Sequence, residues 1–207
     1  MGVYFIMDLK SNQIYEDVTF DNNCEIETEL TGAKFNSCSF QGMDFEAIVT
    51  KRCLFSECNF KGTRMNASKH VKSAFTNCQF DYANLFSSSF EDCKMLGSSF
   101  PEVNFIGISI INGDWSYTNL RLANLKGQNL KGIKFSRADM YKCNLEKTDL
   151  RGADLSYAIL SQASLSGAKL QNANIEGVDL KSANIKGAFM DYTQAVCLAK
   201  SFGIIVE

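Results

Sequence analysis

Residues 145–190 read LEKTDLRGADLSYAILSQASLSGAKLQNANIEGVDLKSANIKGAFM, with a large apolar residue at every fifth position. We call this residue the centre of a five-residue unit. Two residues before it, at the minus-two position, stands a small residue, mostly Ala, and two residues after it, at the plus-two position, Gly is frequent. The unit is A-(D/N)-L-x-G, and a self-repeat this short determines the architecture of everything around it.

The same frame extends backwards over most of the chain. Between Phe20 and Met190, every multiple of five is Phe, Leu, Ile, Met or Trp except Glu25, Thr50 and His70. Most of the 14 glycines lie at plus-two positions, and no insertion or deletion breaks the frame. We therefore expect one repeat domain at residues 16–192, between an N-terminal cap at residues 1–15 and a C-terminal capping helix and tail at residues 193–207.

A period of five excludes an ordinary helix and a single long strand. A helix places apolar residues at i, i+3, i+4 and i+7, and a strand places them at every second position. Period five fits a chain that turns a corner every five residues, so that four units make a square coil of 20 residues. The sequence predicts an all-β fold, a right-handed quadrilateral β-helix with a short C-terminal helix.

Asparagines recur at the coil interval on one side of the predicted coil. We expect their stacked amides to hydrogen-bond from coil to coil, as amide ladders do in other stacked β structures. The column consists of Asn84, Asn104, Asn124, Asn144 and Asn184, interrupted by Ser164.

The interior follows from the same geometry. Large centres fill the axis, and small minus-two residues leave them room. Gly113 stands two residues before Trp115, the only Trp, so that the smallest residue accompanies the bulkiest one. Phe dominates the centres before about residue 105 and Leu after it, which predicts that the two halves differ in turn geometry and coil width.

Most of the eight cysteines also occupy minus-two positions: Cys38, Cys53, Cys58, Cys78, Cys93 and Cys143. Buried thiols that replace Ala as small apolar fillers indicate free cysteines in a reducing, cytoplasmic compartment. The spacing of Cys53 and Cys58 does not fit a zinc knuckle. We therefore expect no metal and no cofactor.

Composition and the N-terminus place the chain among soluble single domains. The chain has 207 residues, 45% of them hydrophobic and 21% charged, with a formal net charge of −2. The apolar run at residues 3–7 is too short for a signal peptide or a membrane span, and we expect it to cover the open end of the first coil. Residues 16–29 carry only acidic charges, which predicts an acidic N-terminal end.

After Met190 the frame stops and a short helix is predicted. Thr193 is the expected N-cap and Gly203 the expected C-terminal stop. An apolar helix face and an aliphatic tail at the end of a chain can cap the last coil and also offer a patch to a symmetric partner. The predicted homodimer interface consists of Leu198, Phe202, Ile204, Ile205 and Val206.

Two of the exceptional centres, Thr50 and His70, are 20 residues apart and therefore neighbours in adjacent coils. Basic residues surround them: Lys51, Arg52, Lys69 and Lys72. Two alternatives remain open here: bulged corners with solvated charges, or a projecting basic patch that contacts a partner. His70 is the only histidine, and no Ser, Cys or carboxylate constellation accompanies it, so we expect no catalytic role and no enzyme.

The ending, DYTQAVCLAKSFGIIVE at residues 191–207, carries a sharper resemblance. Together with the chain length and the Phe-rich first half with Cys at minus-two positions, it resembles the Qnr-type quinolone-resistance proteins and the related topoisomerase-poison immunity proteins. In that family the rod dimerises through its C-terminal end, imitates B-form DNA, and binds DNA gyrase and topoisomerase IV. The resemblance implies a non-enzymatic DNA mimic that protects these enzymes from quinolones or a similar poison.

Two features depart from that family. Several Qnr proteins have loops between coils, whereas the unbroken frame leaves no room for one here. A DNA mimic needs negative charge, yet the net charge is only −2, so mimicry would depend on local patches. The candidate partner-binding residues are Glu25, Glu27, Asp44 and Glu46 on an acidic face, and Lys51, Arg52, Lys69, His70 and Lys72 on an adjacent face that continues, net basic, through Lys131, Arg151 and Lys169.

The alternative function is a generic scaffold or adaptor that uses the rod surface for another protein. Direct binding of nucleic acid would require a basic stripe with interleaved aromatic residues, and a pI of about 5.6 does not favour it. No membrane partner is expected. The C-terminal dimer element distinguishes the two functions, since a scaffold has no need of a symmetric rod twice its own length.

Overall fold

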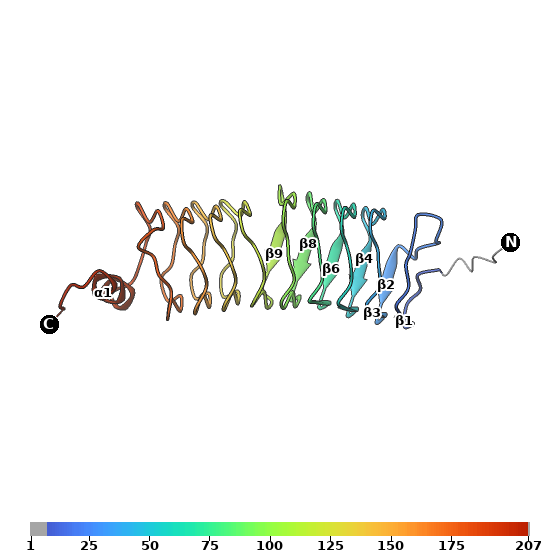
Figure 1. Cartoon of the computed structure of the whole chain (residues 1–207), viewed down its shortest axis with the longest axis horizontal. Coiled ribbons are helices and arrows are strands. Elements are labelled where there is room, and N and C mark those ends of the chain that lie inside the picture. Colours follow the sequence, from blue (N-terminus) through green and yellow to red (C-terminus); the bar gives the residue numbers. More distant parts are fainter. Residues whose placement is uncertain (1–7, 207) are drawn as a thin grey trace.

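The computed structural model describes residues 8–206 and shows a rod of stacked coils with helix α1 at one end (Figure 1). Bridges connect backbone segments 20 residues apart from Thr19 to Phe189, so each coil contains four five-residue units. About nine coils make up the rod. The predicted right-handed quadrilateral β-helix is confirmed, whereas the apolar run at residues 3–7, which was expected to cover the first coil, lies outside the described residues.

The coil has four faces, which we number in the order in which the chain passes through them. Face 1 carries β1 (Ile14–Glu16), β3 (Lys34–Asn36), β5 (Leu54–Ser56) and β7 (Ala74–Thr76). Face 4 carries β2 (Glu29–Thr31), β4 (Val49–Lys51), β6 (Lys69–Val71), β8 (Ser89–Glu91) and β9 (Ser109–Ile111). All these strands pair in parallel with the strand 20 residues on, as Phe35 does with Phe55.

Faces 2 and 3, with centres such as Phe60 and Leu85, are joined by isolated bridges, as is every face after β9. Within residues 8–206, therefore, regular strands occur only in the first half of the rod. This agrees with the predicted difference in turn geometry between the two halves.

Gly62 illustrates how the chain turns each corner. The N–H of Thr63 donates to the carbonyl of Phe60 at 3.1 Å, and Gly62 between them has a φ of 65°. A positive φ at the third residue defines a type II turn, which favours Gly there. The frequency of Gly at plus-two positions follows from this turn.

The Asp or Asn before each centre has a different purpose from the one expected. Oδ1 of Asn84 accepts the N–H of Phe86 at 3.1 Å, and Oδ1 of Asn124 accepts that of Lys126 at 3.3 Å. Such side chains stabilise the turn that follows them. Of the expected amide ladder, the structure has only the bond from Nδ2 of Asn104 to Oδ1 of Asn84, at 3.0 Å. The continuous ladder was a wrong prediction, because the side chains of Asn124, Asn144 and Asn184 hydrogen-bond only to the backbone of their own turns.

Aromatic centres form stacks along the axis of the first half. The rings of Phe35 and Phe55 lie 4.7 Å apart and those of Phe55 and Phe75 lie 4.6 Å apart, nearly parallel in both pairs. Rings on neighbouring faces meet edge to face, as Phe55 and Phe60 do at 5.4 Å. Edge-to-face and offset stacked contacts are the favourable arrangements of aromatic rings. Each buried centre contributes roughly 1.5–3 kcal/mol to stability.

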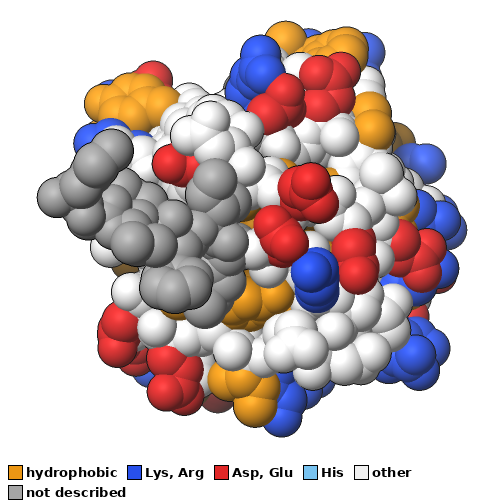
Figure 2. All heavy atoms as spheres, turned by 90° about the vertical axis from the view of Figure 1, so that its right-hand side faces the viewer, with side chains coloured by type: hydrophobic (Ala, Val, Ile, Leu, Met, Phe, Trp, Pro, Cys, Tyr) orange, Lys and Arg blue, Asp and Glu red, His pale blue; other side chains and the backbone are white. Residues whose placement is uncertain are grey.

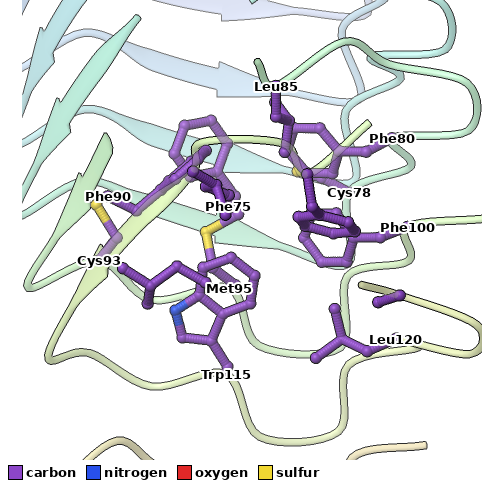
Figure 3. Packing of buried hydrophobic residues seen from close by; sticks show 14 of the residues in the cluster. Phe75, Cys78, Phe80, Leu85, Phe90, Cys93, Met95, Phe100, Trp115 and Leu120 are labelled. Carbon is purple, nitrogen blue, oxygen red and sulfur yellow. The ribbon is translucent and has the colours of Figure 1, made fainter. Parts of the chain in front are cut away.

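Trp115 lies near the C-terminal end of this aromatic interior, which Phe135 completes. Its indole is fully buried and stacks on Phe100 with centroids 5.4 Å apart (Figure 3). A Cβ on Gly113 would lie 2.3 Å from the carbonyl oxygen of Cys93, so no larger residue fits there. The predicted pairing of the largest centre with the smallest minus-two residue is confirmed.

The cysteines at minus-two positions are buried free thiols, as predicted. Burial raises the pKa of Cys93 and of Cys143 to about 12. Because the thiolate is the reactive form, these thiols are chemically inert fillers.

The first coil departs from the frame. Ile26, not Glu25, forms the bridge to Leu9, and the N–H of Leu9 donates to the carbonyl of Glu25 at 2.9 Å. Ile26 packs against the core, while the side chain of Glu25 is exposed. Glu25 therefore does not occupy a centre position in the structure. The inward-facing position in this unit is that of the next residue, Ile26.

Helix α1 comprises Tyr192–Ser201. Its N-cap is Asp191 and not Thr193 as predicted, because Asp191 and Gln194 form a capping box. Oδ1 of Asp191 accepts the backbone N–H of Gln194, and Oε1 of Gln194 accepts the backbone N–H of Asp191. Gly203, with a φ of 81°, terminates the helix as expected.

Candidate protein-binding surfaces

Thr50 and His70 lie inside the rod as opposite residues of β4 and β6. Each side chain is only 1% exposed. Oγ1 of Thr50 lies 2.7 Å from Nδ1 of His70 and 3.1 Å from Oγ of Ser73, and Nε2 of His70 lies 3.0 Å from Oγ of Ser68. Both ring nitrogens and the Thr50 hydroxyl thus have partners, as buried polar groups require.

This geometry corrects two predictions. The backbone at Thr50 and His70 forms ordinary strands, so neither a bulged corner nor a projecting corner exists there. His70 is excluded as a partner-binding residue because its ring is buried. Burial lowers the pKa of His70 to about 3, and the ring is neutral at physiological pH.

The basic residues around this pair remain on the surface of face 4. Lys69, Lys72 and Arg52 are exposed, whereas Nζ of Lys51 lies 2.8 Å from Oε1 of Glu29 in an ion pair. A surface hollow of about 340 Å³ brings the cations beside two carboxylates, and its lining residues are Lys51, Arg52, Val71, Lys72, Glu91 and Asp92. The patch is therefore a mixed one, with Arg52, Lys69 and Lys72 as its exposed cations.

The acidic candidates are all at the surface of the N-terminal end. Figure 2 shows Asp and Glu side chains gathered there around a basic one. Glu27 accepts from the N–H and the hydroxyl of Ser11, and these hydrogen bonds hold the pKa of Glu27 below its usual value. Asp44 forms an ion pair with Arg64, and Glu46 is exposed. Glu25, Glu27 and Glu46 therefore remain available to a partner.

The C-terminal end presents apolar side chains beside a groove. Phe202, Ile204 and Ile205 are exposed, Ile205 to 85%, while Leu198 packs inward against the core. A groove of about 600 Å³ lies between the last coil and α1, and it includes Ile175. The tail and the groove are two apolar surfaces at the same end of the rod, of the kind that association covers.

Gln194 joins the helix to the last coil, and sequence reasoning missed it. It is 4% exposed, and its Nε2 donates to the carbonyls of Leu170 and Ala173 at 2.5 and 2.8 Å. The signal was available, since Asp191 and Gln194 have the spacing of a capping box.

A second missed feature is a Tyr–Arg–Tyr column at the corner of faces 1 and 2. The guanidinium of Arg137 lies 6.0 Å from the ring centre of Tyr117 and 5.0 Å from that of Tyr157. Cation–π contacts of this kind hold an exposed Arg in place. The spacing of 20 residues would have revealed the column, but the sequence alone does not show that all three side chains face outward.

Within residues 8–206, no group of three or more His, Cys, Asp or Glu side chains is placed to hold a metal ion. No helix in this part of the chain is long and apolar enough to cross a membrane.

Comparison with known families places the chain. The profile described as pentapeptide repeats matches residues 118–156 and 158–191, and the profile described as a pentapeptide repeat region matches residues 28–88. Together the matches cover most of the rod, and the chain belongs to the pentapeptide-repeat family. A search of curated proteins finds no significant match.

Solved structures share the fold over nearly the whole chain. A trypsin-treated variant of QnrB1, a plasmid-mediated fluoroquinolone resistance protein, is 19% identical with a TM-score of 0.81, and the match covers 97% of this chain and 100% of the other. Full-length QnrB1 gives a TM-score of 0.73 at 19% identity, over 96% and 100% of the two chains. HetL from the cyanobacterium Nostoc sp. strain PCC 7120, involved in heterocyst differentiation regulation, is 24% identical with a TM-score of 0.55 over 89% and 90%.

Proposed function

We propose that this protein is a non-enzymatic DNA mimic that binds DNA gyrase or topoisomerase IV and protects it from quinolones or a similar poison. The observation that carries the proposal is the match of the whole rod, C-terminal helix included, to QnrB1. The ending at residues 191–207, which resembles the Qnr-type proteins, supports it from the sequence. In this proposal the rod takes the place of a DNA segment on the enzyme.

The dimensions of the rod agree with this function. Nine coils at roughly 4.8 Å, the spacing of neighbouring strands, give about 43 Å. Two rods joined end to end reach about 85 Å, which corresponds to some 25 base pairs at about 3.4 Å each. Such a dimer is as long as a DNA duplex of that size, as replacement of a DNA segment requires.

Dimerisation through the C-terminal end is the second part of the proposal. Ile204 and Ile205 are exposed at the same end of the rod as the apolar groove between the last coil and α1. In a two-fold dimer each tail can enter the partner's groove, because an isologous interface pairs the same patch with itself. The apolar area at this end then becomes buried.

The charges favour contacts at local patches over mimicry along the whole rod. Glu25, Glu27 and Glu46 stand exposed toward the N-terminal end, which lies at the far tip of each arm in a C-terminal dimer. Along the middle of the rod, acidic and basic residues pair, as Lys126 and Glu146 do at 2.7 Å. The acidic tips are therefore the part that a positively charged saddle would attract most strongly.

Supercoiling by purified gyrase tests the proposal. With a fluoroquinolone at an inhibitory concentration, addition of this protein should restore supercoiling, and titration should give a saturating curve. Topoisomerase IV decatenation provides the parallel assay. If the protein neither binds these enzymes nor changes quinolone action on them, the alternative function, a scaffold or adaptor for another protein, takes its place.

A further inference from the structure

The hydrogen bonding from coil to coil is interrupted in the middle of the rod. Elsewhere between the first and the last coil the faces are bridged, for example by Arg64–Asn84 and Asn84–Asn104 on face 3, and the one other missing bridge is Ile159–Asp179 on face 2 near the C-terminal end. Among the described residues, the expected bridges Asn104–Asn124 on face 3 and Ser109–Asn129 on face 4 do not form. Figure 1 shows the coil after β9 set apart from it along one side.

The interruption includes the complete backbone network of the two faces. In a regular segment the N–H of Leu85 donates to the carbonyl of Asn104 at 3.1 Å, and the N–H of Asn84 donates to that of Thr63 at 3.0 Å. No hydrogen bond or ion pair in the described chain joins residues 101–112 to residues 121–132. We call the space between these two segments the mid-rod gap.

Faces 1 and 2 stay connected beside the gap. The bridges Ser99–Asn119 and Asp114–Lys134 are intact, and the N–H of Phe100 donates to the carbonyl of Asn119 at 3.0 Å. The coils on either side of the gap are therefore joined along faces 1 and 2 and separated along faces 3 and 4, so the gap has the shape of a wedge.

Bulky side chains crowd the coil at the wedge. Val103 and Ile108 occupy minus-two positions, where the rest of the frame has mostly Ala, Cys, Ser or Thr, and Ile108 is buried. Such residues do not separate coils by themselves, because Met43 and Ile48 are also buried at minus-two positions and their coils are bridged through Asp44–Arg64 and Val49–Lys69. At the wedge the two bulky residues share their coil with Trp115, the largest centre in the chain. We attribute the separation on faces 3 and 4 to this combination, since extra side-chain volume in a close-packed interior forces the backbone apart.

Cavities mark both corners of the gap. One of about 230 Å³ is lined by Phe100, Val103 and Leu122 among others, and one of about 320 Å³ by Ile110, Ile111 and Gln128 among others. Neither family profile matches residues 89–117, which include the first of the two segments that border the gap. Regular repeats thus flank an irregular coil.

We propose that the mid-rod gap is a hinge between two stiff stacks, residues 8–112 and 113–190. The stacks tilt about the continuous side formed by faces 1 and 2, and the gap opens and closes on faces 3 and 4. Tilting breaks no backbone hydrogen bond, because those of the open faces are already absent. The hinge lets the rod adjust its curvature to the surface that it binds, whichever partner that is.

Distance distributions between spin labels test the hinge in the full-length chain. Cysteines at Val71 and Arg151 lie four coils apart on face 4 and span the gap, whereas cysteines at Thr31 and Ile111 lie four coils apart on the same face within one stack. Cys24→Ser and Cys197→Ser remove the two thiols that are not buried. The spanning pair should give a distinctly broader distribution than the control pair. Equal widths would overturn the hinge.

Relief of the overpacking supplies a second test. In the unmodified protein the amides of Phe105 and Ile110 should exchange hydrogen at least about tenfold faster than those of Leu85 and Phe90, which are paired. The double variant Val103→Ala, Ile108→Val should slow exchange at Phe105 and Ile110 and narrow the spanning distribution. Ile48→Val, a minus-two change at a buried residue whose coil is fully paired through β2, β4 and β6, is the control. A folded double variant with unchanged exchange and width would contradict the proposed cause.

Discussion

The hydroxyl of Thr50 lies 2.7 Å from Nδ1 of His70 in the interior of the rod, where the surrounding centres are apolar. The two residues replace a pair of large apolar centres by a hydrogen-bonded pair that also engages Ser68 and Ser73. A buried imidazole with this environment is neutral, and its ring stacks on Phe90 at 4.7 Å as a phenyl ring would.

The His70 pair makes stability depend on pH. Burial lowers the pKa of His70 to about 3 in the folded state, against an ordinary value of 6.5 when unfolded. Between these values the unfolded chain binds the proton and the folded chain does not, so stability should fall as the pH decreases from about 6.5 to about 3. Thermal melts across this range should show the loss, and His70→Phe should remove that part of it. The same acid dependence in His70→Phe would contradict the assignment.

Centre and minus-two residues should differ sharply in their effect on stability. Phe80→Ala removes a fully buried ring from a stack and should cost about 3–5 kcal/mol, and Leu150→Ala about 2–5 kcal/mol. Cys78→Ala should cost about 1 kcal/mol or less, because the side chain stays small and apolar. Denaturant unfolding measures all three. Equal losses at Phe80 and Cys78 would show that the two positions do not have these separate roles.

Gln194 should be essential for the C-terminal cap. Gln194→Ala leaves the carbonyls of Leu170 and Ala173 without their donor and removes half of the capping box, so a loss of about 1–3 kcal/mol is expected. Hydrogen exchange should rise first in α1 and the last coil. Thr193→Ala, which removes a side chain that is not the N-cap, is the matched control and should have little effect.

Dimerisation should depend on the exposed tail. Ile205→Glu places a charge at a side chain that is 85% exposed in the single chain, so the fold should remain while the dimer weakens. Removal of residues 194–207 should also give a monomer, with the last coil uncovered. Light scattering at micromolar concentration decides. An unmodified protein that is monomeric under these conditions would overturn the dimer.

Neutralisation of the charges on each of the two patches should separate electrostatic attraction from specific contact. Glu25→Gln, Glu27→Gln and Glu46→Gln together should weaken protection of gyrase, and added salt should weaken binding of the unmodified protein, because exposed charges are screened over about 8–10 Å. Arg52→Gln, Lys69→Gln and Lys72→Gln make the rod more acidic. If the basic patch contacts the enzyme, this second variant should lose protection as well; improved protection would exclude such a contact.

Much of the architecture was determined by the sequence itself. A period of five, with a large centre and a small residue two positions earlier, specifies which side chains point inward in every coil. The Phe stacks, the inert thiols and the pairing of Trp115 with Gly113 follow from that alternation, because the direction of a side chain depends on its position in the local repeat. The C-terminal helix was equally visible, although its cap at Asp191 was assigned to Thr193.

Only the tertiary structure decided how side chains of neighbouring coils pack together and which of them hydrogen-bond to each other. Thr50 and His70 look like defects in the repeat, yet they lie inside because they find partners in adjacent units and in the next coil. The shift at Glu25 and the gap beside Val103 and Ile108 arise in the same way, from the space and hydrogen bonds available across coils. The repeat determines which side chains point inward. Whether they fit, and whether their polar groups find hydrogen-bond partners, depends on residues about 20 positions away in the neighbouring coil.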